Sequence, residues 1–146
     1  MMPSVREIAE GETELAARAL LELRPQCAPV SNIVDLVDRV QRPLGYRLVG
    51  SFEDGERDAA AVAGFRIGHM LAWGRYLYVD DLVTAADRRQ RGHADRVFEW
   101  LQDEGRRREC DSFHLDSGVI PERADAHRFY FRHRLRISSY HFEQRL

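Results

Sequence analysis

The segment that most constrains the fold runs from Tyr76 to Arg107, where a strand pattern leads through a short turn into a helix pattern. Residues 76–84 are rich in the aromatic and branched apolar side chains that favour strands. The helix, expected from about Arg91, carries one apolar face made of Ala94, Val97, Phe98 and Leu101. An amphipathic helix that directly follows a strand packs on a sheet, so this segment predicts an α/β fold.

Hydrophobic periodicity and turn residues predict the remaining elements. Further strands are expected at Val5–Ile8, Tyr46–Phe52, Ala59–Ile67, Ser112–Ser117 and Ile137–Phe142. A first helix is expected at Glu12–Arg24, where apolar residues recur at helical spacing: Leu15, Ala16, Ala19, Leu20 and Leu23. A second is expected after a cap at Ser31 or Asn32, with the buried stripe Ile33, Leu36, Val37 and Val40. A further helix is expected at Ala124–Arg132. Asp54-Gly55 is expected to form a tight hairpin turn, and Gly68, Trp73 and Gly74 a loop. Without a repeat or linker, the chain is expected to be a single domain of residues 1–146.

Composition argues against several classes of protein. The net charge of −2 gives no field that would favour nucleic acid or an anionic membrane, although all 22 basic residues are arginine. The longest apolar run is too short to cross a bilayer. Cys27 and Cys110 match no metal-ligand spacing, and with no signal-peptide pattern we expect a cytoplasmic protein.

The turn before the long helix has the features of a phosphate site. Arg88, Arg89 and Arg91 lie at the helix N-terminus, where the macrodipole already carries partial positive charge. A bound anion would balance these charges, and Gly92 would let a phosphate approach the backbone N–H groups. Ala94 is small enough to keep the approach open. The alternative is a solvated loop in which the arginines form salt bridges.

These residues match a known motif. Arg89, Gly92 and Ala94 occupy the positions of the signature Arg/Gln-x-x-Gly-x-Gly/Ala, and residues 126–130 match a second element, Ala-x-x-Phe-Tyr. In these motifs, and in their spacing, the chain resembles the GNAT superfamily of N-acetyltransferases from Tyr46 onward. The resemblance implies a mixed, mostly antiparallel central sheet flanked by helices.

The resemblance also implies acetyl-CoA as co-substrate. The backbone of Leu82, Val83 and Thr84 would hold the pantetheine arm, and Tyr130 would stand near the sulfur as general acid. The pyrophosphate would bind the backbone amides of Arg89, Gln90, Arg91, Gly92, His93 and Ala94. Three departures from the family pattern concern turn geometry: His93 replaces an apolar residue, while Glu109 and Arg134 stand where glycine is common.

The acceptor side is expected around Asp80 and Asp81. Side chains alternate along a strand, so these carboxylates should point to opposite faces, and one of them should face a site. Asp80 shares its face with Tyr76 and Tyr78, which could line an acceptor pocket, whereas Asp81 is expected to pair with an arginine. The pattern resembles the diamine and polyamine branch of the superfamily. That branch implies a role for Asp80 toward the acceptor amine, either as the base itself or through a water relay.

Several other polar residues are assigned from their positions. Asp116 and Ser117 are expected to line the same cleft, and His114 is expected to be a partnered structural residue. No metal is assigned, because the spacing of His127, His133 and His141 does not fit zinc. The arginine cluster near the C-terminus, at residues 128–136, is expected to be solvated.

The leading hypothesis is an acetyl-CoA-dependent N-acetyltransferase. Its acceptor would be the primary amine of a polyamine-like, amino-acid-like or antibiotic-like small molecule, attacking directly in a ternary complex. The alternatives are a non-catalytic acetyl-CoA or CoA sensor, a protein or peptide N-terminal acetyltransferase, and a nucleic-acid binder, which the charge disfavours. A homodimer is expected, with Tyr140 and Phe142 at a partly buried edge of the last strand.

Overall fold

The computed structural model describes residues 3–146, which fall into two compact units, Met1–His114 and Leu115–Leu146. The first contains a five-stranded sheet in the order β1-β2-β3-β4-β5. Its strands are β1 (Ser4–Ile8), β2 (Arg47–Phe52), β3 (Ala61–Met70), β4 (Gly74–Thr84) and β5 (Ser112–Leu115). Its helices are α1 (Glu14–Leu23), α2 (Val30–Leu36) and α3 (His93–Arg107). The single domain expected from the sequence stays a prediction.

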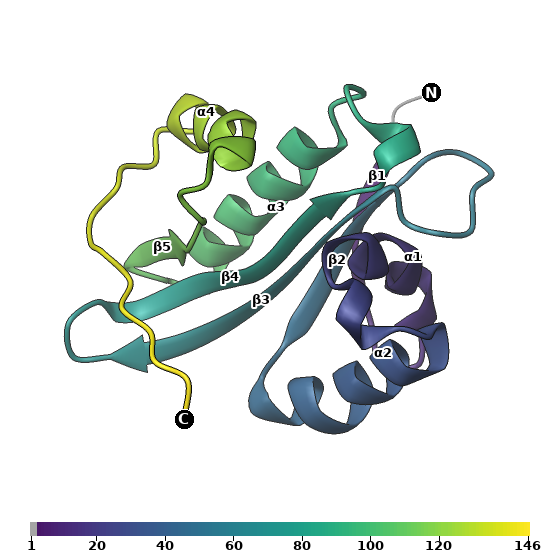
Figure 1. The fold of residues 1–146 in the computed structure, drawn as a ribbon, viewed down its shortest axis with the longest axis horizontal. Coiled ribbons are helices and arrows are strands. Elements are labelled where there is room, and N and C mark those ends of the chain that lie inside the picture. Colours follow the sequence, from purple (N-terminus) through teal and green to yellow (C-terminus); the bar gives the residue numbers. More distant parts are fainter. Residues whose placement is uncertain (1–2) are drawn as a thin grey trace. The chain divides into compact units, whose positions relative to one another are not determined.

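The sheet has the predicted mixed, mostly antiparallel form, flanked by helices. β1 to β4 pair successively in antiparallel fashion, and α3 connects β4 to β5 (Figure 1). Strand order therefore follows chain order. The longest pairing joins β3 and β4, and it carries one irregularity of register, at Gly64 and Phe65.

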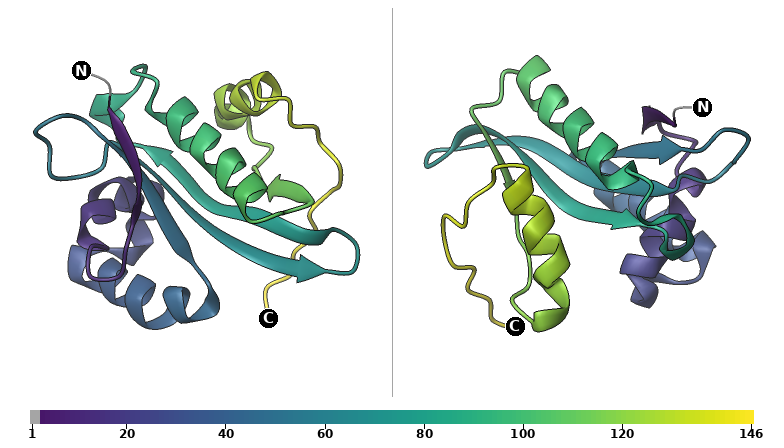
Figure 2. Two further views of the ribbon diagram at one scale, coloured as in Figure 1. Left: turned by 180° about the vertical axis from the view of Figure 1, so that it is seen from behind. Right: turned by 90° about the horizontal axis from the view of Figure 1, so that it is seen from above.

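Helices cover both faces of this sheet, with α1 and α2 on one side and α3 on the other (Figure 2). Ala16, Ala19 and Leu20 of α1 are buried in a cluster that includes Leu48 and Val62 of the sheet. Val97, Phe98 and Leu101 of α3 are fully buried, as are Phe65 and Leu77 on β3 and β4. The inward faces predicted for α1 and α3 are therefore confirmed.

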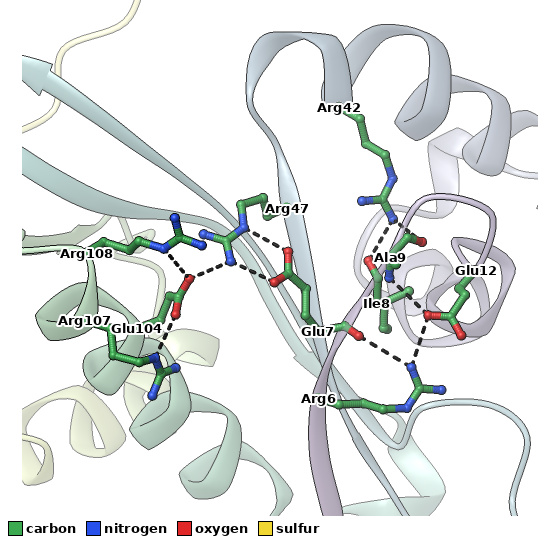
Figure 3. A network of polar contacts seen from close by, with 10 residues as sticks. All are labelled: Arg6, Glu7, Ile8, Ala9, Glu12, Arg42, Arg47, Glu104, Arg107 and Arg108. Carbon is green, nitrogen blue, oxygen red and sulfur yellow. Dashed lines mark hydrogen bonds and ion pairs between the residues drawn. The ribbon is translucent and has the colours of Figure 1, made fainter.

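A buried carboxylate ties α3 to the sheet. Glu104, with a side chain only 6% exposed, accepts hydrogen bonds from Arg47 of β2 at 2.6 Å and from Arg107 and Arg108 (Figure 3). Burial alone would raise the pKa of Glu104, but the bonds from these arginines lower it. Arg47 also forms two hydrogen bonds to Glu7, so one guanidinium joins β1, β2 and α3.

The two residues that stand where the family commonly has glycine, after α3 and after the C-terminal helix, adopt the left-handed conformation that favours glycine. Glu109 has φ 57° and Arg134 has φ 67°. After α3, Cys110 N donates to Gly105 O and Glu109 N donates to Arg106 O, which is the Schellman pattern of helix termination. The same pattern follows α4 (Ala124–Arg132) of the second unit. These departures from the family pattern therefore add backbone strain without changing the turn.

The last strand predicted, Ile137–Phe142, does not form. No strand follows β5 in residues 116–146, and Tyr140 and Phe142 are 86% and 91% exposed. An extended segment becomes a strand only where a neighbour takes its backbone hydrogen bonds, and within the second unit no other strand is present to do so. The homodimer expected through this segment stays a prediction.

The second helix differs from its predicted form. It begins at Val30 after Pro29, so Ser31 and Asn32 do not cap it. A π-helical turn, Val37–Gln41, widens the helical period and shifts the stripe. Ile33 and Val37 are accordingly buried, whereas Leu36 and Val40 are 39% and 48% exposed.

Two loops also differ from prediction. The tight turn at Gly55, with φ 78°, forms only part of the connection 53–60, and β3 begins at Ala61. Gly68 belongs to β3 and not to a loop. The Tyr76 side chain lies where a Cβ at Gly68 would stand. β5 ends at Leu115, so Asp116 and Ser117 follow the strand.

Each helix in the described residues 3–146 is either too short or too polar to span a membrane.

We predict that Glu109→Gly stabilises the protein. Relief of left-handed strain gains roughly 1–2 kcal/mol, and the added freedom of the unfolded glycine costs roughly 0.5–1 kcal/mol, so a net gain of about 0.5–1 kcal/mol is expected. Urea unfolding measures it. Glu109→Ala is the matched control, since it keeps the strained Cβ and should bring no such gain. Equal stabilities of the glycine and alanine variants would contradict the prediction.

Candidate active site

The turn between β4 and α3 presents a row of backbone N–H groups. Arg88 N donates to Ala85 O, and Arg96 N makes the first bond of the helix, to Gly92 O. Between them, the N–H groups of residues 89–94 have no acceptor in the described part of the chain. Gln90 and Gly92 are left-handed, with φ 64° and 81°. Left-handed residues in a turn direct successive N–H groups to one side, which creates a concave site for an anion.

The positive charges around this row are partly compensated by one carboxylate. Glu53, at the end of β2, forms ion pairs with Arg91 at 2.8 Å and with Arg88 at 3.3 Å. Arg89 is exposed and forms no hydrogen bond or ion pair with the described residues. The salt-bridged alternative therefore describes Arg88 and Arg91, and Arg89 alone remains available to an external anion.

The side chain of His93 supports the turn from inside. It is 1% exposed; Nδ1 lies 2.7 Å from Ser51 Oγ, and Nε2 lies 3.0 Å from Glu53 Oε1. His93 thus joins the first turn of α3 to the end of β2. Only its backbone N–H faces the anion site, so this departure from the family pattern does not block the site.

The turn and the strand edge beside it leave backbone groups accessible to an anion and to an extended ligand. A Cβ at Gly92 would lie 3.0 Å from Arg96 Nη1 and would be strained by the positive φ. Residues Leu82–Thr84 pair with β3 on one side. On the other side, the loop before β5 meets the opposite end of β4, where Asp111 N donates to Arg75 O. Four residues long, β5 does not extend to Leu82–Thr84, so that backbone edge is open to an extended ligand.

A β-bulge in β4 places two carboxylates together. Gly64 pairs with Asp81 and Phe65 with Val79, so Asp80 is the extra residue. Because a bulge interrupts the alternation of side chains, the expectation that Asp80 and Asp81 face opposite sides is wrong. Asp80 contacts Arg66, the residue after Phe65, and Phe65 contacts Trp100 of α3. Arg66 and Asp80 therefore lie on the face opposite α3.

Asp81 lies on the same face and is fully engaged. Arg24, just after α1, donates to Asp81 Oδ1 at 2.9 Å, and the Tyr46 hydroxyl donates to Oδ2 at 2.8 Å. The salt bridge predicted for Asp81 is thereby confirmed. Burial, together with the Asp81 carboxylate, raises the pKa of Tyr46 well above its usual value, so its hydroxyl keeps the proton it donates. A Cβ at Gly64 would overlap the Tyr46 ring, so the contact requires glycine there.

Asp80 keeps part of its carboxylate open. Its side chain is 15% exposed, and its partner is Arg66, with Nε 3.1 Å from Oδ2. Burial raises the pKa of Asp80, and the bond from Arg66 partly opposes that rise. Tyr78 pairs with Arg66 across the strands, and Tyr76 pairs with Gly68. Tyr76 and Tyr78 thus lie on the same face of the sheet as the Arg66–Asp80 pair, as predicted for Asp80.

The second unit contains its own cavity, with a volume of about 660 Å³. Tyr130 of α4, Asp116 and Ser117 line it. Burial raises the pKa of Tyr130 above its ordinary value of 10, and the neighbouring Arg123 opposes only part of that rise. The phenol is therefore protonated at neutral pH. Ser117 Oγ lies 3.1 Å from His127 Nε2, and His141 Nδ1 lies 2.9 Å from Asp116 Oδ2. The structure therefore brings three predicted site residues, Asp116, Ser117 and Tyr130, to one cavity.

The other histidines do not form a metal centre. His114 stacks on Trp73 with ring centroids 3.6 Å apart and lies 2.8 Å from Ser112 Oγ, in agreement with a partnered structural residue. Within residues 3–146, no group of three or more His, Cys, Asp or Glu side chains could hold a metal ion.

Sequence reasoning missed Glu53, Arg66 and Tyr46. Glu53 lies in a hairpin connection where acidic residues are common, and only the fold brings it to the arginines. Arg66 could have been found from the alternation along β3, because it faces the same side as Gly64 and Gly68. The Tyr46 contact depends on the bulge, for which the sequence gives no signal.

Comparisons with known proteins identify the family and the fold. The sequence model of the acetyltransferase (GNAT) family matches residues 10–134. No curated protein matches the sequence at a significant level. Among solved structures, an aminoglycoside N-acetyltransferase in complex with CoA is 15% identical, with TM-score 0.81 and coverage of 99% of this chain and 94% of that one.

Two further structures share the fold. A ribosomal-protein-alanine N-acetyltransferase from Brucella melitensis is 17% identical, with TM-score 0.81 and coverage of 98% of this chain and 99% of that one. A transcriptional regulator from Bacillus halodurans is 18% identical, with TM-score 0.77 and coverage of 99% of each chain. At these identities the likeness shows the fold alone.

We predict that Glu53→Gln destabilises the protein in a pH-dependent way. The bond with His93, with further bonds and charge from Arg91 and Arg88, lowers the pKa of Glu53 from 4.5 to about 2. The stabilisation by ionised Glu53 is therefore complete above pH 4.5 and is lost as the pH falls toward 2. Urea unfolding should show a wild-type advantage at about pH 7 that shrinks at about pH 3.

The matched control is Glu56→Gln, because Glu56 also approaches Arg88 but is half exposed. Its effect should stay within about 1 kcal/mol, as for exposed ion pairs. A difference between wild type and Glu53→Gln that is the same at both pH values would contradict the prediction.

Proposed function

We propose that this chain, which belongs to the acetyltransferase (GNAT) family, transfers an acetyl group from acetyl-CoA to the primary amine of a small molecule. The observation that carries the proposal is the row of unpaired backbone N–H groups at residues 89–94, beside the exposed Arg89. The family match and the fold it shares with a CoA-bound acetyltransferase support the same donor. The amine is proposed to attack the thioester directly in a ternary complex.

Acetyl-CoA supplies the activated acyl thioester, and the residues of this chain bind and orient it. The N–H groups of residues 89–94 would bind the pyrophosphate, with Arg89 adding a mobile charge. The open edge at Leu82–Thr84 would bind the pantetheine through backbone hydrogen bonds. These interactions would position the reacting group.

Asp80 is the proposed acceptor-side residue. Burial raises its pKa above the ordinary carboxylate value, and the hydrogen bond from Arg66 partly opposes that rise. In its ionised form the Asp80 carboxylate can bind and orient the incoming amine. The proton of the amine then passes to Asp80 or to a water molecule beside it, and Tyr78 borders the same position.

Tyr130 is proposed as the general acid from its place in the Ala-x-x-Phe-Tyr element. Its environment supports this role, because a protonated phenol can donate to a departing thiolate. Asp116 and Ser117 are proposed as further acceptor-side residues from their positions in the sequence, directly after β5. A cytoplasmic location and a homodimer belong to the same proposal.

One assay separates the alternative functions. CoA release, measured as free thiol, is followed with a panel of small amines and with peptide N-termini. Turnover with small amines supports the proposal. A preference for peptides supports the N-terminal acetyltransferase, and CoA binding without turnover supports the sensor.

We predict that Asp80→Asn lowers kcat/KM for the best amine by roughly 10²- to 10⁴-fold, the range of general acid–base and orienting groups. The wild-type rate should fall at acidic pH as Asp80 becomes protonated, at a pH above the ordinary carboxylate value of 3.8. The pH–rate profile of the variant should lack that limb. Unchanged turnover would contradict the role of Asp80.

We predict that Arg89→Ala raises the KM for acetyl-CoA by about 5- to 20-fold with little change in kcat, because one charge-assisted contact contributes roughly 1–2 kcal/mol. Arg57→Ala is the control, since Arg57 is similarly exposed in the first unit but lies outside the turn. A KM that is equal in the two variants would exclude Arg89 from the binding of the cofactor.

A further inference from the structure

The pair formed by Arg66 and Asp80 suggests which amines the proposed acceptor site takes. Arg66 Nε and Nη2 both lie 3.2 Å from Asp80 Oδ1. The guanidinium has five N–H donors, and this side-on contact uses one edge of the group. Nη1 has no partner among the described residues, so the edge formed by Nη1 and Nη2 remains available.

An available guanidinium edge is suited to a carboxylate, which it binds through two parallel hydrogen bonds. The Arg66 side chain is 47% exposed, so a ligand can reach that edge. A polyamine would instead bring a second cation toward Arg66 and would be repelled. The face is therefore not simply anionic: it presents an anion and a cation side by side.

The neighbouring carboxylate provides a contrast. Both oxygens of Asp81 have partners, Arg24 on Oδ1 and Tyr46 on Oδ2. Arg24 also donates through Nη2 to the backbone oxygen of Asp80. Arg24 thus binds two groups of the protein, the Asp81 carboxylate and the Asp80 backbone oxygen, whereas Arg66 binds the Asp80 carboxylate alone.

We propose that the acceptor is an α-amino acid or a close analogue, with its carboxylate bound by Arg66 and its amine directed to Asp80. The amine and carboxylate of an α-amino acid are separated by one carbon atom, so both can contact two side chains that are themselves in contact. Tyr76 and Tyr78 of β4 lie on the same face as the pair and offer a surface for the amino acid's side chain. This inference rests on the proposed function and makes Arg66 a specificity-determining residue.

The test compares kcat/KM for an α-amino acid and for the amine that lacks its carboxylate: phenylalanine with phenethylamine, and lysine with cadaverine. Thiol release should give the amino acid a kcat/KM roughly 10- to 100-fold higher, since a charged bidentate contact contributes about 1.5–3 kcal/mol. Arg66→Gln should bring this ratio close to one, because kcat/KM should fall more for the amino acid than for the decarboxylated amine. Arg66→Lys keeps the charge without the planar edge and should give an intermediate ratio.

Arg24→Gln is the matched control, because Arg24 is similarly exposed and pairs with the neighbouring aspartate. It should lower stability and leave the ratio unchanged. Urea unfolding of all variants shows that a changed ratio does not come from loss of the fold.

The outcomes separate the inference from the proposed function. Two results overturn the inference and leave the proposed transferase activity intact. One is wild-type protein that acetylates the decarboxylated amines as well as the amino acids, and the other is an Arg66→Gln variant that keeps the wild-type ratio.

No thiol release with any amine contradicts the proposed transferase activity. Thermal unfolding then tests the site directly. A rise in Tm with phenylalanine that is absent with phenethylamine and lost in Arg66→Gln supports the inference, and no such rise overturns it.

Discussion

The extra residue in β4 decides what the acceptor face can do. In a regular antiparallel pairing, one of two consecutive aspartates would point into the apolar layer beneath α3, where an ionised carboxylate is costly. The bulge removes that cost, because Asp80 becomes the additional residue and both carboxylates lie opposite α3. One of them is then used for structure, through Arg24 and Tyr46, and the other keeps an accessible surface. The glycine at position 64, which admits the Tyr46 ring, is part of the same arrangement.

The helix end at Gly92 follows a different principle. Three arginines there would oppose the macrodipole if nothing balanced them. Glu53 supplies the balance from another strand, and its contacts with His93, Arg91 and Arg88 lower its pKa to about 2. The turn is therefore held in shape by the protein itself, before any anion binds. Such preorganisation reduces the entropy that binding must remove.

The sequence predicted the parts of this fold that depend on local patterns. The strand–turn–helix segment around Gly92 and the apolar faces of α1 and α3 follow from periodicity and turn chemistry, and both agree with the structure. The bulge could not be predicted, because it depends on the register between β3 and β4 and leaves no pattern in β4 itself. The strand expected at Ile137–Phe142 was wrong for a related reason: alternation shows that a segment could be a strand, but a neighbour must take its hydrogen bonds.

Local sequence patterns also could not predict which residues contact the site residues. Glu53 lies 38 residues from Arg91 and Arg66 lies 14 residues from Asp80, so only the paired strands and the position of α3 bring these charges together. The sequence could nominate Asp80, because a carboxylate within an apolar strand is conspicuous. It could not show that the same side chain already contacts a cation.

Backbone strain separates structural turns from the proposed binding turn. The described residues contain three left-handed residues other than glycine, Gln90, Glu109 and Arg134. After α3 and α4, the strained residue is compensated by paired hydrogen bonds that end the helix. Gln90 has no such compensation within the protein, since the N–H groups around it have no acceptor in the described chain. Strain that persists without an internal hydrogen-bonding gain is typical of ligand-binding turns. The conformation at Gln90 therefore supports the proposed anion site, because a bound anion would accept those N–H groups and compensate the strain.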